Sequence, residues 1–132
     1  MHKHKTMIRM AHTDAAGWMF FAAVFELAHE CYETFMDEQG MSLGAMLDRG
    51  SYLAPIVHAE ADFSKPMRLS ESITIELSLG KIGKGSFMLS YKFVNSDGET
   101  TAKVATVHAM IDKATGRCSK MPGELAAVLG RL

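Results

Sequence analysis

The sequence predicts an α+β fold in which an antiparallel curved sheet of about five strands wraps around one long helix. One observation is a long helical pattern over residues 20–39, with apolar side chains on more than one face. A second is that, after residue 50, four segments show the period of two that is typical of strands. Short turns join these strands, which favours antiparallel pairing. A curved sheet is the simplest cover for such a helix, so residues 1–132 are expected to form a single domain.

The N-terminal half is expected to begin with a short strand over Thr6–Met10 and a turn over Asp14–Gly17. The long helix should then cover Phe20–Gln39, since Gly40 is a common helix stop. Its main apolar face is spaced at i, i+3, i+4, i+7 and i+11. That face consists of Val24, Leu27, Ala28, Cys31 and Phe35. A second, shorter helix is expected over Met41–Arg49, with Ser42 as its cap and Gly50 at its end.

The C-terminal half is expected to be a meander of strands. Turn-forming residues separate the segments at Lys65-Pro66, at Gly83-Lys84-Gly85 and at Ser96-Asp97-Gly98. Pro122 suits the first turn of a closing helix over Gly123–Leu129. The expected strands are Tyr52–Ser64, Ser72–Ile82, Ser86–Val94 and Thr100–Asp112.

The composition argues against several classes of protein. Fourteen Lys and Arg balance fifteen Asp and Glu, so there is no basic excess for a nucleic-acid surface. No apolar run reaches the roughly 20 residues that a membrane span needs. The basic N-terminus leads into a strand and not into the apolar core of a signal peptide, so we expect a cytoplasmic protein. Cys31 and Cys118 form no metal-binding or disulfide pattern and are expected to be free thiols.

The turn between the first strand and the long helix carries the most informative chemistry. It reads Thr13-Asp14-Ala15-Ala16-Gly17, a carboxylate followed by three small residues. The small residues let a substrate approach the backbone, and the following helix N-terminus offers unpaired N–H groups. A polarised carbonyl could bind there with Asp14 near its carbon, which is the outline of an acyl-transfer site. The alternative is that Asp14 or Thr13 only caps the turn.

A set of motifs stands out along the chain: Asp14-Ala15-Ala16-Gly17, Phe20-Phe21, His29-Glu30-x-Tyr32-Glu33, Val57-His58-Ala59, Asp62-Phe63, Lys65-Pro66, Ile82-Gly83-Lys84 and Ser86-Phe87. Together they resemble the hot-dog fold thioesterases, and more narrowly the 4-hydroxybenzoyl-CoA thioesterase family. Nearly the whole chain, residues 5–112, is covered by the resemblance. Within the family, the chain is most similar to the 1,4-dihydroxy-2-naphthoyl-CoA thioesterases of quinone biosynthesis. It departs from the family at Trp18-Met19, where smaller aliphatic residues are common.

The resemblance implies hydrolysis of an aroyl- or acyl-CoA thioester to free acid and CoA. Asp14 would act as nucleophile or as general base, and both routes are open to a carboxylate. The backbone N–H of Phe21 would polarise the carbonyl oxygen, and Gly17 would keep the turn open. Trp18, at the departure from the family, is expected to bind substrate and to change the shape of the acyl pocket, which leaves the acyl group open. No metal or redox cofactor is implied, because thiolate is a good leaving group and coenzyme A is part of the substrate.

Other residues are expected to bind substrate. Lys81, Lys84 and Ser86 lie where the family contacts the CoA nucleotide, although they could equally form a solvated hairpin tip. His58 would hydrogen-bond an aryl hydroxyl, unless it is satisfied at a strand or subunit interface. Hot-dog sheets pair edge to edge, so we expect a homo-oligomer, a dimer or a dimer of dimers, with sites between subunits.

Four other functions stay open at this stage. One is a short-chain acyl-CoA thioesterase of other metabolism. A related branch of small acyl-CoA thioesterases usually carries His at the position of Phe21, so the Phe found here argues against that branch. Another is a non-catalytic module that binds acyl-CoA. A third is a hot-dog hydratase or dehydratase. Those enzymes usually pair a catalytic His with an acid near the start of the helix, but here His12 precedes Asp14 instead of following it. The last is a structural domain with a vestigial pocket.

Overall fold

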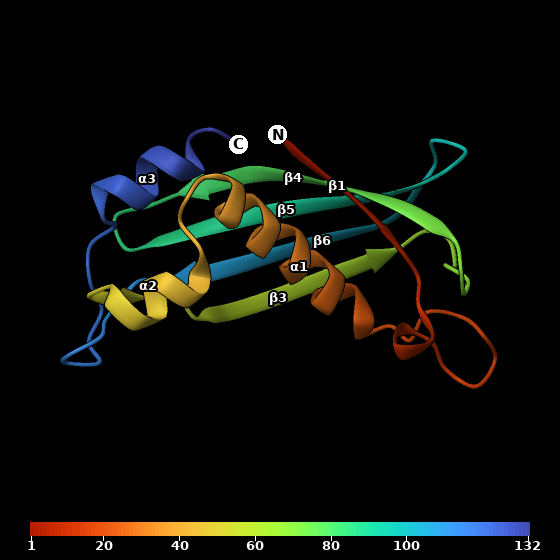
Figure 1. Cartoon of the computed structure of the whole chain (residues 1–132), viewed down its shortest axis with the longest axis horizontal. Coiled ribbons are helices and arrows are strands. Elements are labelled where there is room, and N and C mark those ends of the chain that lie inside the picture. Colours follow the sequence, from red (N-terminus) through yellow and green to blue (C-terminus); the bar gives the residue numbers. More distant parts are fainter.

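The computed structural model describes residues 1–132, which form one antiparallel sheet with a long helix across one of its faces (Figure 1). The five-stranded sheet has the order β1-β4-β5-β6-β3, and β2 pairs with β7 beside it. This is the expected α+β arrangement. The elements are β1 (His2–Met7), a 3₁₀ turn (Met10–His12), α1 (Ala23–Glu38), α2 (Leu43–Arg49), β2 (Tyr52–Leu53), β3 (Ile56–Phe63), β4 (Ser72–Ile82), β5 (Ser86–Asn95), β6 (Thr100–Ala109), β7 (Ile111–Asp112) and α3 (Gly123–Leu129).

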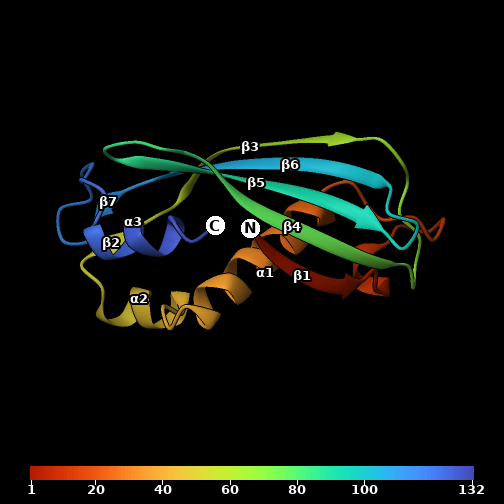
Figure 2. The same ribbon diagram turned by 90° about the horizontal axis from the view of Figure 1, so that it is seen from above.

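The hydrophobic core lies between α1 and the inner face of the sheet. Figure 2 shows the sheet and α1 as two layers. All five residues of the expected apolar face of α1 are buried. Alternate residues of the central strands face them, so that Ile75 pairs with Phe93 and Leu77 with Tyr91 across β4 and β5. The period of two in these strands and the helical period in α1 therefore describe two sides of one core.

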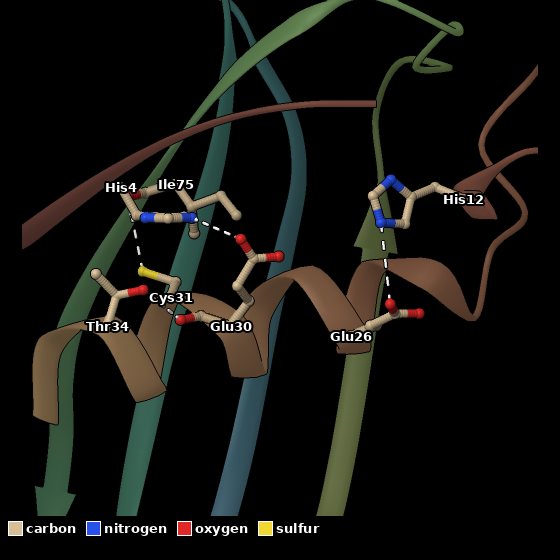
Figure 3. A network of polar contacts seen from close by, with 7 residues as sticks. All are labelled: His4, His12, Glu26, Glu30, Cys31, Thr34 and Ile75. Carbon is tan, nitrogen blue, oxygen red and sulfur yellow. Dashed lines mark hydrogen bonds and ion pairs between the residues drawn. The ribbon is translucent and has the colours of Figure 1, made fainter. Parts of the chain in front are cut away.

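The first strand begins earlier than the sequence suggested. We expected it over Thr6–Met10, but β1 covers His2–Met7 and Met10 already lies in the 3₁₀ turn. Histidines take the inward positions of β1 and hide its period: the ring of His2 lies 5.6 Å from that of Phe35. The Nε2 of His4 lies 3.2 Å from a carboxylate oxygen of Glu30, as Figure 3 shows.

Two expected strands are each divided in the structure. Tyr52–Ser64 splits into β2 and β3 around Ala54-Pro55, because proline donates no hydrogen bond to a ladder. Thr100–Asp112 splits into β6 and β7 around Met110, whose N–H bonds the carbonyl of Gly85 instead. The two short pieces pair with each other and close one end of the sheet.

The helices agree more closely with expectation. The Ser42 Oγ accepts a hydrogen bond from the N–H of Ala45, which caps α2 as expected. Pro122 precedes α3 directly, and α3 has the expected bounds. The long helix is shorter than expected, because Phe20–Ala22 form a turn before α1. No helix is long and apolar enough to cross a membrane.

The fold separates two ends of the molecule. The loop of residues 13–20 and the start of α1 lie at one end, on the right of Figure 1. The β4–β5 turn, α2, α3 and the beginning of β3 lie at the other end. β4 has 11 residues and extends about 36 Å between these ends at the usual rise of a strand. This separation decides which residues one chain can bring together.

Candidate active site

A small hairpin positions Asp14. The N–H of Asp14 donates to the carbonyl of Trp18 at 2.9 Å, and the N–H of Phe20 donates to that of His12 at 2.8 Å. The far arm of the hairpin is tied to the β3–β4 connection, since the N–H of Leu69 donates to the carbonyl of Gly17 at 3.0 Å. The hairpin is therefore held from both sides, and it returns the chain to the start of α1.

The carboxylate of Asp14 is exposed and oriented by its own turn. One oxygen, Oδ1, accepts a hydrogen bond from the N–H of Ala16 at 2.9 Å, while Oδ2 has no partner within the chain. The N–H of Gly17 donates to the backbone carbonyl of Asp14 at 3.1 Å and closes the turn. Gly17 has a φ of +80°, which favours glycine. The turn thus fixes one carboxylate oxygen and leaves the other free.

The start of α1 offers unpaired donors. α1 begins at Ala23, after the N-cap residue Ala22. The backbone N–H groups of Phe21 and Ala22 donate to no group of the chain. Such free N–H groups at a helix N-terminus attract an oxygen that carries partial negative charge. Phe20 and Phe21 are half or more exposed, so the entrance to this region is apolar.

His12 is a neighbour of the turn that the sequence did not single out for a role. Its side chain is buried, and its Nδ1 accepts a hydrogen bond from the backbone N–H of Arg9 at 3.0 Å. Nε2 then carries the proton of the neutral ring and faces Glu26 on α1 at 4.0 Å (Figure 3). The available signal was its place two residues before Asp14, on the same side of an extended chain.

Trp18, expected to shape the acyl pocket, lies beneath a cation. The guanidinium carbon of Arg68 is 4.3 Å from the centre of the Trp18 ring, a cation–π contact. The two side chains line an open hollow of about 530 Å³ that also contains Lys65. Ser70, in the same hollow, has a φ of +70°. Arg68 and Lys65 bring two cations to this hollow, although Lys65 is ion-paired with Glu99 and Glu71 also lines it.

The other expected binding residues lie far from Asp14 in the same chain. Lys81, Lys84 and Ser86 lie at the β4–β5 turn, at the opposite end of the sheet. His58 lies near the beginning of β3, exposed, with its Nε2 3.1 Å from a carboxylate oxygen of Glu60. A single chain therefore brings Asp14, Gly17, Trp18 and Phe21 together and leaves the rest at its other end.

A second histidine that the sequence did not indicate is buried at that other end. The ring of His108 stacks on Phe87, with centres 4.5 Å apart. Its Nδ1 lies 3.1 Å from the carbonyl of Ala54, and its Nε2 lies 3.1 Å from the hydroxyl of Thr106. A carbonyl can only accept, so Nδ1–H donates and Nε2 accepts. Burial lowers the pKa of His108 below its ordinary value and keeps the ring neutral.

Comparisons with known proteins agree with this architecture. Residues 8–129 match the thioesterase-like superfamily. A 1,4-dihydroxy-2-naphthoyl-CoA hydrolase from Synechococcus elongatus is 32% identical over 125 residues, which is 94% of this chain and 91% of the relative. Another 1,4-dihydroxy-2-naphthoyl-CoA hydrolase, from Nostoc punctiforme, is 33% identical over 118 residues, which is 89% of this chain and 79% of the relative.

The solved structures confirm the fold. A 1,4-dihydroxy-2-naphthoyl-CoA thioesterase from Synechocystis superposes with a TM-score of 0.92 over 99% of this chain and 96% of the other, at 22% identity. The hot-dog arrangement expected from the sequence motifs is therefore confirmed. On the strength of the match over residues 8–129 and of the relatives above 30% identity, this chain belongs to the thioesterase-like superfamily.

Proposed function

We propose that this protein hydrolyses an aroyl-CoA thioester to the free acid and CoA, with Asp14 at the reacting carbon. The observation that carries the proposal is the free Oδ2 of Asp14, whose Oδ1 accepts from the Ala16 N–H at a turn that leads to unpaired N–H groups. The names of the relatives make 1,4-dihydroxy-2-naphthoyl-CoA the first substrate to test, which would assign the enzyme to quinone biosynthesis.

The geometry supports two routes to the same products. In one, Asp14 takes a proton from water, which attacks the thioester carbon. In the other, Asp14 attacks directly and forms an anhydride that water then cleaves. In both, negative charge develops on the carbonyl oxygen, and the N–H of Phe21 is free to bind it; such a donor contributes ~3 kcal/mol. Collapse expels the CoA thiolate, so the reaction needs no metal or redox cofactor.

The proposed enzyme is a dimer or a dimer of dimers with sites between subunits. β3 is an edge strand whose outer N–H and C=O groups pair with nothing, which favours pairing with another strand. Its side chains Ile56, Val57 and Phe63 are 42%, 62% and 47% exposed. If a two-fold axis pairs the β3 strands of two copies antiparallel, opposite ends of the two sheets lie side by side. This arrangement would bring Asp14 of one copy near the partner's His58 and β4–β5 turn.

This pairing gives the remaining binding residues a role. The Lys81, Lys84 and Ser86 of one copy would contact the CoA that is cleaved at the other copy's Asp14. Trp18 and Arg68 add cationic and aromatic surface beside the turn. A cytoplasmic location accompanies this substrate class, because coenzyme A is a large polyanion that does not cross a bilayer unaided.

Release of free CoA, read with a disulfide dye, tests the proposal. The ester panel contains dihydroxynaphthoyl, hydroxybenzoyl, phenylacetyl, short-chain and long-chain groups. Asp14→Asn keeps an acceptor for the Ala16 N–H but loses the base, so turnover should fall by about 10²–10⁴-fold. Asp97→Asn, at the exposed tip of the β5–β6 hairpin, is the matched control and should be unchanged.

Unchanged turnover in Asp14→Asn would overturn the role of Asp14. If the protein binds these esters but releases CoA from none of them, its function would be to sense the esters and not to hydrolyse them.

A further inference from the structure

Three histidines of the N-terminal segment face carboxylates of α1, and only the last of them lies beside the candidate site. His2 and His4 belong to β1, where their ring nitrogens lie 3.4 Å and 3.2 Å from carboxylate oxygens of the helix. These two contacts hold an edge strand of the sheet against α1. His12 follows β1, faces Glu26 on the same helix (Figure 3) and comes two residues before Asp14.

The main chain of His12 connects the two groups that the proposed reaction uses. Its carbonyl accepts a hydrogen bond from the N–H of Phe20 at 2.8 Å, and the next N–H along the chain is the unpaired one of Phe21. On the other arm of the hairpin, Asp14 follows His12 after a single residue. A displacement of His12 would therefore reach both the Asp14 carboxylate and the Phe21 N–H through one or two residues.

The ring of His12 holds this main chain from two sides. Its Nδ1 accepts the backbone N–H of Arg9 at 3.0 Å, which closes the 3₁₀ turn of Met10–His12. Its Nε2–H faces Glu26, which lies in the first turn of α1, across 4.0 Å. That distance is too long for a direct hydrogen bond, so the contact is electrostatic. The ring thus braces the first arm of the hairpin between the segment after β1 and the start of α1.

This bracing depends on the protonation state of the ring. An imidazolium carries a proton on both nitrogens and has no acceptor, so its Nδ1–H would oppose the N–H of Arg9 across 3.0 Å. The charged ring would be attracted to Glu26, but that side chain is 71% exposed and water screens the attraction. Asp14 is the other charged residue on this side of the chain. Protonation should therefore release the ring from Arg9 and draw it toward α1.

We infer that His12 is a positioning residue whose neutral ring sets the place of the Asp14 carboxylate relative to the Phe21 N–H, and that protonation of the ring lowers turnover. The inference rests on the proposed function and adds to it a residue and a pH dependence. His12 touches no reacting atom and acts through the hairpin. Because it holds no part of the substrate, its loss should lower kcat and leave KM nearly unchanged.

The first test removes the ring and then restores its acceptor, with CoA release measured at pH 8. His12→Leu loses both nitrogens, so kcat should fall by about 10–100-fold, with KM within about twofold. His12→Asn has an amide oxygen two bonds from Cβ, where Nδ1 was, and should recover kcat to within about threefold of the wild type. His4→Leu is the matched control, because His4 faces Glu30 one turn further along α1, and it should keep the wild-type kcat. Equal losses in the two leucine variants, or no recovery in His12→Asn, would overturn the inference.

The second test uses the pH dependence of kcat, which a purely structural role would not alter, and it needs no variant that lacks the acceptor. Histidine side chains change charge between about pH 5 and 8, so wild-type kcat should fall by about tenfold as the pH drops through this range. His4→Asn should keep this step. His12→Asn should lose it, because an amide does not ionise, and should keep the separate loss that protonation of Asp14 causes. A step that persists unchanged in His12→Asn would overturn the inference.

The amide NMR signals of Asp14 and Phe21 test the inference without any turnover, so the two proposals fail in distinguishable ways. In the wild type and in His4→Asn, both signals should shift between pH 8 and 5, and in His12→Asn this step should be absent. If the protein releases CoA from no ester but the signals behave in this way, the function is wrong and the role of His12 in placing the two groups stands. If the protein is active and His12→Asn changes neither the signals nor the pH profile, the function stands and the inference is wrong.

Discussion

Replacing Gly17 by alanine separates the cost of a strained turn from the loss of catalysis, because the chain offers a matched control. Gly17 has a φ of +80° and Gly98 a φ of +79°, and an added Cβ would meet no atom within 4 Å at either position. Both substitutions should therefore cost the same backbone strain, about 1–2 kcal/mol. For 132 residues this corresponds to a fall in Tm of about 4–7 °C.

Only the Gly17 variant should also lose activity. Gly17 donates to the carbonyl of Asp14, so a turn that relaxes to relieve the strain moves the Asp14 carboxylate. A displacement of about 1 Å at a reacting group can cost about 10²-fold, so we expect kcat/KM to fall by roughly 10–100-fold in Gly17→Ala. Gly98→Ala, at the β5–β6 hairpin, should keep wild-type turnover. Calorimetry and CoA release measure the two effects. Equal activity in both variants would refute the positioning of Asp14 by this turn.

The remaining predictions concern stability and reactivity. Burial raises the pKa of the Cys31 thiol to about 12, whereas Cys118 is exposed, so a disulfide dye should label one thiol of the native protein quickly and the second only after unfolding; rapid labelling of both would contradict the buried position. The lowered pKa of His108 means that the unfolded chain binds the extra proton, so its contribution to stability is complete above about pH 6.5 and is lost as the pH falls below it. Urea midpoints at pH 8 and pH 5.5 should differ less in His108→Gln than in the wild type, and an unchanged difference would exclude this histidine. Ser42→Ala should lower the free energy of unfolding by about 1 kcal/mol, because the N–H of Ala45 loses its cap; no change in urea unfolding would contradict that role.

The sequence predicted correctly those elements whose apolar residues can pack against only one surface of the fold. The apolar face of α1 and the alternation in β4 and β5 are satisfied by each other, so their periods survive in the structure. β1 was misplaced because its inward residues are histidines, which bond carboxylates of α1 and look like a polar tail. Interior position there depends on partners from a distant segment, which local pattern does not encode.

In the candidate site too, the residues placed by local geometry were predictable and those placed by distant contacts were not. Asp14 and Gly17 belong to one turn, and their geometry follows from local rules for small residues and positive φ. His12 and Arg68 gain their significance only from neighbours distant in sequence, Glu26 for His12 and Trp18 for Arg68. Contacts of this kind are a property of the packed structure, so no local pattern of residues could have indicated them.

The two interpretations of Asp14 left open by the sequence, a turn cap and a catalytic acid, are compatible in the structure. Oδ1 accepts the Ala16 N–H and orients the carboxylate, and this bond leaves Oδ2 exposed for chemistry. Two substitutions separate the roles. Asp14→Asn keeps the capping oxygen and should match the wild type in stability while losing turnover; Asp14→Ala should lose both, with a cost of about 0.5–1.5 kcal/mol for the missing bond. If Asp14→Asn were as unstable as Asp14→Ala, the negative charge itself would hold the turn, and a loss of activity in Asp14→Asn could no longer be assigned to the base alone.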